Sequence, residues 1–145
     1  MAFETRILDS GDHGVLADVA PGVFDNAVDP RLVAEFLGDH RHHLAVAIDQ
    51  GQVIGFASGV HYVHPDKPPE LWINEVGVAP SHQGRGVGKA VIRAVLRHAK
   101  RLGCVEAWVL TDRSNQAAMR LYTSTGGREG PHDHVMFTFF LDADT

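Results

Sequence analysis

The chain has 145 residues, 44% of them hydrophobic, which is enough for one well-buried core, so we expect a single domain over 1–145. Its formal net charge of −5 disfavours a nucleic-acid partner, which calls for a clustered basic face, and suits a cationic substrate. The single Cys104 excludes an intramolecular disulfide, and the lack of a signal peptide or of a bilayer-length apolar stretch predicts a cytoplasmic protein with no membrane partner.

The spacing of apolar residues predicts alternating strands and helices, and hence an α/β fold. Alternation over 3–8 is typical of an edge strand, and two apolar runs around the turn Asp49-Gln50-Gly51-Gln52 predict a hairpin. Helical spacing predicts an amphipathic helix that begins near Gly86 and ends before Gly103. The predicted elements are strand 3–8, a short helix 12–19, helix 30–38, strands 44–48, 53–60 and 71–78, helix 86–102, a buried strand 104–110, helix 115–122 and strand 134–141.

Acidic residues in two loops are candidates for binding a cationic substrate. Asp25 and Asp29 lie in the loop before helix 30–38, where Asp29 also precedes Pro30 as a candidate helix cap. Asp66 lies in a proline-rich loop, and rigid loops often determine specificity. We therefore expect these three carboxylates to assist in capturing a cation.

The cluster His40-Arg41-His42-His43 raises the question of a metal site. Residues two and three apart in a loop make no recognised zinc spacing, and no cysteine lies nearby. We therefore interpret the cluster as a solvated turn and predict no metal site.

A glycine-rich loop opens the helix 86–102. Between Gln83 and Lys89 three glycines occur at alternate positions, where the first N–H groups of the helix lack intrahelical partners. The helix dipole and the positive charges of Arg85 and Lys89 favour an anion such as a pyrophosphate. A P-loop needs a hydroxyl residue after its lysine, but Ala90 follows Lys89, and the glycine spacing does not fit a dinucleotide-binding loop. An ordinary glycine-rich turn is the alternative.

The pattern Gln83-x-x-Gly86-x-Gly88 after strand 71–78 resembles motif A of the GNAT family of N-acetyltransferases. The resemblance covers nearly the whole chain and implies a mixed, mostly antiparallel sheet flanked by helices, with a splayed strand pair that binds acetyl-CoA. It implies the cofactor-binding residues Val76, Gly77, Val78, Gln83, Gly84, Arg85, Gly86, Val87, Gly88, Lys89, Asn115, Ala118 and Tyr122.

Within this family the chain most resembles the aminoglycoside 3-N-acetyltransferases. The shared features are Glu75 in the motif strand, Ala118-x-x-Leu-Tyr122 and the last strand over 135–139. Two features depart from that branch: Asn115 stands in a segment that is more acidic there, and the ending FTFFL lacks an acidic residue. The resemblance assigns Asn115 to hydrogen bonding with pantetheine, and a cap of its own helix is the alternative.

Acetyl transfer to an amine requires a base, because an alkyl ammonium with a pKa of about 10.4 is mostly protonated at pH 7. Glu75 interrupts the apolar run 72–78 and is the candidate base, which also binds the cationic amine. A solvent-facing or ion-paired strand residue is the alternative. Tyr122 is the candidate acid toward the departing thiolate, and a core tyrosine is its alternative. His132 and His134 are further candidates for proton transfer, although a polar turn explains them equally.

We therefore expect an acetyl-CoA-dependent N-acetyltransferase that uses direct attack, because Cys104 lies in an apolar strand with no base beside it in sequence. The predicted acceptor is a cationic small-molecule amine, an aminoglycoside above all. Acetylation of a protein N-terminus or lysine, and a catalytically silent acyl-CoA-binding sensor, are the alternatives. The apolar last strand would be exposed at a sheet edge unless paired, which predicts a homodimer.

Overall fold

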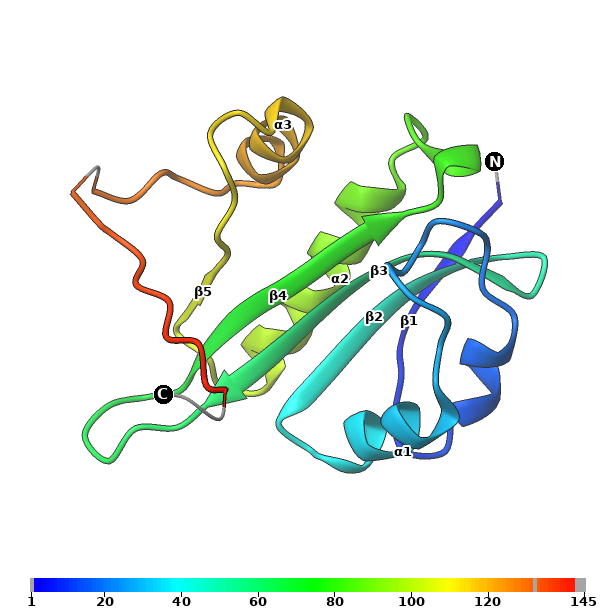
Figure 1. Cartoon of the computed structure of the whole chain (residues 1–145), viewed down its shortest axis with the longest axis horizontal. Helices are drawn as coiled ribbons and strands as arrows, with labels where there is room; N and C mark the ends of the chain where they lie inside the picture. The colour runs from blue at the N-terminus through cyan, green and yellow to red at the C-terminus, as the bar shows by residue number, and fades with distance from the viewer. Residues whose placement is uncertain (1, 132, 143–145) are drawn as a thin grey trace.

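The computed structural model describes residues 2–131 and 133–142. A five-stranded sheet has the order β1-β2-β3-β4-β5, antiparallel except for its parallel β4–β5 pair. The elements follow the predicted order from the first strand to the last helix (Figure 1). They are β1 Glu4–Ile7, the 3₁₀ helix η1 His13–Ala17, α1 Pro30–Gly38, β2 His42–Asp49, β3 Gln52–Tyr62, β4 Glu70–Val78, the 3₁₀ helix η2 Pro80–His82, α2 Val87–Arg101, β5 Glu106–Trp108 and α3 Gln116–Ser124.

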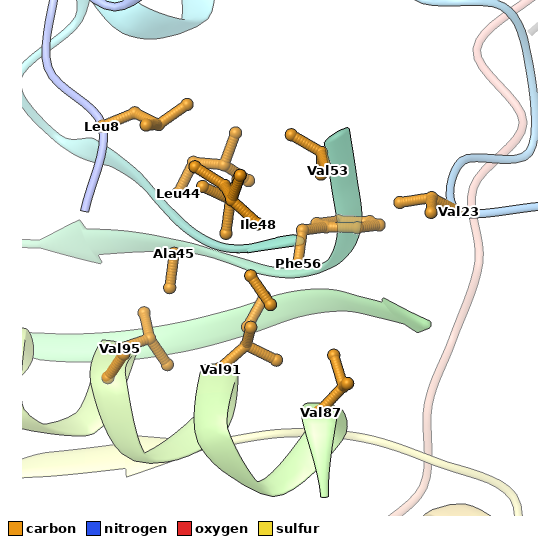
Figure 2. Close-up of a cluster of buried hydrophobic side chains, with 14 of the residues drawn as sticks. Leu8, Val23, Leu44, Ala45, Ile48, Val53, Phe56, Val87, Val91 and Val95 are labelled. Atoms are coloured by element: carbon orange, nitrogen blue, oxygen red, sulfur yellow. The ribbon is translucent and has the colours of Figure 1, made fainter. Parts of the chain in front are cut away.

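Apolar side chains cover both faces of the sheet. On one face α2 packs across β1 to β4 with its buried stripe, which includes Val87, Val91 and Val95. On the other face Leu44 and Phe56 pack beneath the segment that precedes α1, which contributes Val23. Figure 2 shows these two layers, with Ala45 of β2 pointing toward α2. The core therefore fixes both α2 and the loop before α1 against the central strands.

The hairpin β2–β3 is confirmed, and its turn explains why the sequence predicts it well. Asp49 pairs with Gln52, and the two residues between them have positive φ, 50° at Gln50 and 80° at Gly51. Such angles match the right-handed twist of the strands and favour glycine at the second position. The edge strand β1 and the Asp29 cap of α1 are also confirmed, since Asp29 accepts a hydrogen bond from the Arg31 N–H.

Strands β4 and β5 separate after a short paired segment. Pairing is confined to Glu70–Trp72 of β4 and Glu106–Trp108 of β5. Beyond Trp72, β4 continues to Val78 while the chain after β5 leaves toward α3 (Figure 1). The splayed pair that the sequence analysis predicts is therefore present, and it leaves one backbone edge of β4 without a strand partner in the described residues.

Two predictions about the last strands are wrong. The strand predicted over 104–110 is only three residues long and not buried, because β4 is the only strand that pairs with β5 among the described residues. Val105 and Leu110 on either side of β5 are exposed. The strand predicted over 134–141 does not form within the described residues, where its large apolar side chains are at least 76% exposed. Apolar content alone does not make a strand, which needs a hydrogen-bonded neighbour. The homodimer inferred from that strand stays a prediction.

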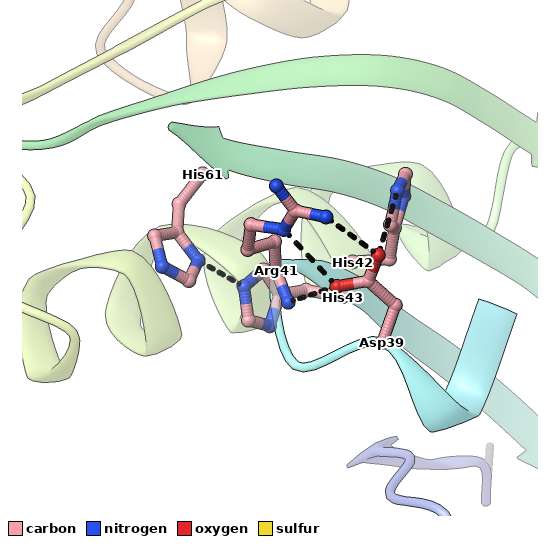
Figure 3. Close-up of polar contacts among 5 residues, drawn as sticks. All are labelled: Asp39, Arg41, His42, His43 and His61. Atoms are coloured by element: carbon pink, nitrogen blue, oxygen red, sulfur yellow. Dashed lines mark hydrogen bonds and ion pairs between the residues drawn. The ribbon is translucent and has the colours of Figure 1, made fainter. Parts of the chain in front are cut away.

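The interpretation of His40 to His43 as a solvated turn is wrong for His43. His42 begins β2, so His43 enters the sheet and is buried, hydrogen-bonded to His61 of β3 and His98 of α2. In Figure 3 Arg41 and His42 instead reach Asp39, whose hydrogen bonds from Arg41 lower the pKa of its carboxyl to about 2. Within the described residues no group of acidic, histidine or cysteine side chains has the geometry of a metal site.

No helix in the described part of the chain is both long and apolar enough to cross a membrane.

Candidate active site

The loop before α2 has the geometry of an anion cradle. Gly86 caps α2 with a left-handed φ of 82°, and Gly84 has a φ of 77°, which strongly favours glycine at both positions. No side chain of the described residues caps this end of α2, and the space where a Cβ of Gly84 or Gly86 would point is open. The first N–H groups of α2 therefore remain available to an anion, and Lys89 lies in the first turn.

A cavity of about 1130 Å³ lies over this loop and between α2 and α3. Its wall includes Val76 and Val78, at the point where β4 has lost its β5 neighbour. Helices α2 and α3 approach closely beside it, because a Cβ on Gly88 would lie 3.4 Å from the Leu121 methyl groups. Of the thirteen predicted cofactor-binding residues, eleven line this cavity and Gly77 and Arg85 do not; the eleven are Val76, Val78, Gln83, Gly84, Gly86, Val87, Gly88, Lys89, Asn115, Ala118 and Tyr122.

Tyr122 lies on α3 and lines the same cavity. Burial raises the pKa of its phenol above the ordinary value, so the hydroxyl stays protonated at neutral pH. No described residue accepts or donates a hydrogen bond at this hydroxyl, which leaves its proton available to a ligand. Asn115 serves as the cap of α3, where its Oδ1 accepts from the Ala118 N–H at 3.0 Å.

Glu75 lies on β4 and lines a second cavity of about 350 Å³. Its partner across the ladder is the buried Ser58 of β3, and the register then shifts so that Ile73 faces Gly59. The shift leaves Asn74 without an opposite residue, and both Asn74 and Glu75 line the cavity. A bulge of this kind redirects side chains. Glu75 has no ion pair or hydrogen bond to another described side chain, so its carboxylate is open to a ligand.

The two cavities share no lining residue in the described part of the chain, but neighbouring residues of β4 line both of them. Asn74 and Glu75 line the smaller one, while Val76 and Val78 line the larger one. Gly77 lies between Val76 and Val78 and cannot carry a side chain, because a Cβ there would collide with the Val23 carbonyl and the Phe56 ring. Ligands in the two cavities would therefore contact neighbouring residues of the same stretch of β4.

Of the other three predicted substrate-binding residues, two line the cavity of Glu75 and one does not. Asp25 lines the cavity of Glu75, and so does Asp29, although the Asp29 carboxylate already caps α1. Asp66 lies in the β3–β4 loop, paired with Lys67 at 3.4 Å, and lines neither cavity. His134 is exposed and lines neither cavity, and His132 lies outside the described residues.

Several cavity residues are missing from the sequence-based predictions. His82 lines the larger cavity, where its Nε2 lies 2.9 Å from the Asp49 carboxylate and its Nδ1 lies 2.8 Å from the Ser81 hydroxyl. Its position next to Gln83 is the one signal that the sequence offers. Phe24 and Phe56 line the smaller cavity with stacked rings, a contact between distant segments that no local pattern indicates.

Comparison with known proteins identifies relatives of the chain. The model of the acetyltransferase (GNAT) family matches residues 15–126. N-alpha-acetyltransferase RimI of Mycobacterium tuberculosis is 37% identical over 92 residues, which cover 63% of this chain and 55% of that protein. A mycothiol acetyltransferase of Thermomonospora curvata is 39% identical over 85 residues, covering 57% of this chain and 27% of that protein. The chain thus spans about half or less of these relatives.

Solved structures extend the comparison to nearly the whole chain. An aminoglycoside acetyltransferase from a soil metagenomic sample, solved with trehalose, has a TM-score of 0.80 at 19% identity and covers 95% of this chain and 97% of that one. The aminoglycoside N-acetyltransferase AAC(6')-Iy, in complex with CoA, has a TM-score of 0.73 at 26% identity, over 97% and 96% of the two chains. The predicted fold class is therefore confirmed.

Proposed function

Because the chain belongs to the acetyltransferase (GNAT) family, we propose that it transfers the acetyl group of acetyl-CoA to a primary amine bound beside Glu75. One observation carries the proposal: neighbouring residues of β4 line both the cavity over the glycine-rich loop and the cavity of Glu75. The first suits the donor and the second suits the acceptor. RimI and AAC(6')-Iy, which are similar to this chain, are named as N-acetyltransferases.

The larger cavity has the features that acetyl-CoA requires. The uncapped N–H groups of α2 and the charge of Lys89 suit the pyrophosphate. The β4 edge at Val76–Val78, which has no strand partner among the described residues, offers backbone groups to the amides of the pantetheine arm. Asn115 supports this arm through its role as the cap of α3, which lines the cavity.

Acetyl-CoA supplies an activated thioester, and the side chains of the chain handle the protons. The Glu75 carboxylate binds the ammonium and accepts one of its protons, so that the neutral amine attacks the acetyl carbon. As the new C–N bond forms and the C–S bond breaks, the Tyr122 hydroxyl donates its proton to the departing sulfur, and the surplus proton of the attacking nitrogen returns through solvent to the Tyr122 phenolate, which leaves a neutral amide and a free thiol. Burial raises the pKa of the Cys104 thiol, which disfavours a thiolate and hence an acetyl-cysteine route.

Two acceptor classes have support from the comparisons. The structural neighbours favour an aminoglycoside, and RimI, an N-alpha-acetyltransferase, favours a protein N-terminus. The net charge of −5 suits either cation. A homodimer and a cytoplasmic location remain part of the proposal.

Two assays test the proposed function. Calorimetry measures acetyl-CoA binding, and thiol release with a panel of amines measures transfer. We expect micromolar binding and thiol release that depends on an amine. Binding without thiol release for any amine would instead support a catalytically silent acyl-CoA sensor, and absence of both would contradict the donor site.

A further inference from the structure

The cavity beside Glu75 is mainly apolar. Ten of its sixteen lining residues are apolar side chains from four parts of the chain. Phe24 and the buried Phe56 line it with stacked rings whose centroids are 4.3 Å apart. Val33 and Phe36 of α1 add aliphatic and aromatic surface. Such surface binds hydrocarbon well and gives hydroxyl groups nothing to hydrogen-bond.

The charges in the cavity are few and of one sign. Glu75 and Asp25 have no ion pair with any described residue, whereas the Asp29 carboxylate accepts from the Arg31 N–H at 2.9 Å and lies 3.8 Å from its guanidinium. No basic side chain lines the cavity in the described part of the chain. The site therefore attracts a cation, and its negative charge comes from the carboxylates of Glu75, Asp25 and Asp29.

A neighbouring cavity of about 800 Å³ continues this apolar character. It shares the segment 24–28 with the cavity of Glu75, and Leu16, Val19 and Ala20 contribute to its wall. A ligand whose apolar group is too large for the cavity of Glu75 could therefore extend onto the apolar surface of this neighbouring cavity.

We propose that the acceptor is a primary amine whose single ammonium is attached to an apolar aromatic or aliphatic body. This inference rests on the proposed function and specifies its substrate. The ammonium binds Glu75, and the body lies against Phe24 and Phe56. A polycationic, polyhydroxylated amine fits less well, because the ten apolar lining side chains offer its hydroxyls no hydrogen bonds and Asn26, Ser58 and Asn74 are the uncharged polar ones among the described lining residues.

Thiol release with a graded set of acceptors tests the proposal. We expect kcat/KM to rise by about fourfold per added methylene in a series of n-alkylamines. We expect the kcat/KM for 2-phenylethylamine to exceed the kcat/KM for kanamycin. Two peptides, one beginning with Phe and one with Asp, test whether the amine can be a peptide N-terminus. A higher kcat/KM for the peptide that begins with Phe would show that the apolar body can be the first side chain of a peptide.

A variant at the cavity rim tests the apolar character of the site, and a variant outside the cavities serves as its control. Leu32 lines the cavity and is 59% exposed, so Leu32→Asp does not disturb the core and places an acid in the first turn of α1, where the dipole favours it. We expect kcat/KM to fall by about tenfold for 2-phenylethylamine and to rise for kanamycin. Val63→Asp, at a loop residue that is 72% exposed and lines neither cavity, should change neither value.

The outcomes separate the two proposals. If kanamycin outperforms every apolar amine, or if Leu32→Asp leaves both acceptors unchanged, the substrate proposal is wrong while the acetyltransferase proposal stands. If no amine releases thiol although calorimetry shows bound acetyl-CoA, the proposed function fails and the substrate proposal fails with it.

Discussion

The Nε2 atom of His43 on β2 lies 2.7 Å from the Nδ1 atom of His61 on β3. The other nitrogen of His43 lies 2.9 Å from His98 Nε2 on α2, so three imidazoles form one hydrogen-bonded row across the core. Burial lowers the pKa of His43 to about 4, with a further contribution from the neighbouring His98. Burial also lowers the pKa of His61, and the nearby charges of His40 and Arg41 lower it further. Burial lowers the pKa of His98 as well, with a contribution from Arg101. The folded protein therefore keeps His43 neutral.

This row predicts that the protein loses stability in mild acid. Between about pH 6.5 and about pH 4 the unfolded chain binds a proton at His43 that the folded chain does not. The free energy of unfolding therefore decreases as the pH is lowered through this range. The full loss is about 3 kcal/mol. Urea unfolding across this range measures it. His43→Leu should flatten the pH dependence and the exposed His13→Leu should not, and equal slopes in all three proteins would contradict the account.

Tyr122 is predicted to act in turnover and not in binding. Tyr122→Phe removes the hydroxyl and keeps the ring that packs against the core, so the turnover number should fall by about tenfold to a hundredfold. Acetyl-CoA affinity measured by calorimetry should stay within about twofold. An unchanged turnover number would assign Tyr122 to packing and the proton to another donor.

Lys89 is predicted to contribute charge to the pyrophosphate site. Lys89→Gln should weaken acetyl-CoA binding by about tenfold at low salt, and the difference should shrink as salt screens the charge. Lys100→Gln is the matched control, because this exposed lysine lies in the last turn of the same helix. Equal affinities of the two variants in calorimetry would show that Lys89 does not contact the cofactor.

Asp25 is predicted to help capture the amine. Its carboxylate lines the cavity of Glu75 without an ion pair to a described residue, so Asp25→Asn should raise KM more than it lowers kcat. Asp66→Asn removes the same charge from a loop outside both cavities and should leave KM unchanged. A larger rise in KM for Asp66→Asn than for Asp25→Asn would show that the acceptor binds outside the cavity of Glu75.

Local chemistry explains which parts of this fold could be predicted from the sequence. The turn at Gln50-Gly51, the Asp29 cap and the positive φ of Gly86 depend on residues a few positions apart, and all three follow from residue type. The prediction of a strand over 134–141 is wrong for the opposite reason, since a strand needs a hydrogen-bonded partner that its own residues do not specify.

Two sources predict the site: local sequence predicts the glycine-rich loop, and the resemblance to the GNAT family predicts Asn115, Ala118 and Tyr122, which line the same cavity. The glycine-rich loop is one continuous stretch, and the structure gives it the predicted form. The bulge that directs both Asn74 and Glu75 into one cavity depends on the register between β3 and β4, which residue type does not determine. The burial of His43 and the stacking of Phe24 on Phe56 likewise join segments far apart in the chain.

The pH dependence of turnover in Glu75→Gln tests the central claim most directly, namely that this carboxylate binds the amine and accepts its proton. Glutamine keeps the shape and cannot act as the base, so turnover at pH 7 should fall by a factor of about 10² or more. The loss should shrink as pH rises, because more of the amine is then already neutral. Profiles of wild type and Glu75→Gln that superimpose over the whole pH range would contradict the claim and make Glu75 a structural residue of β4.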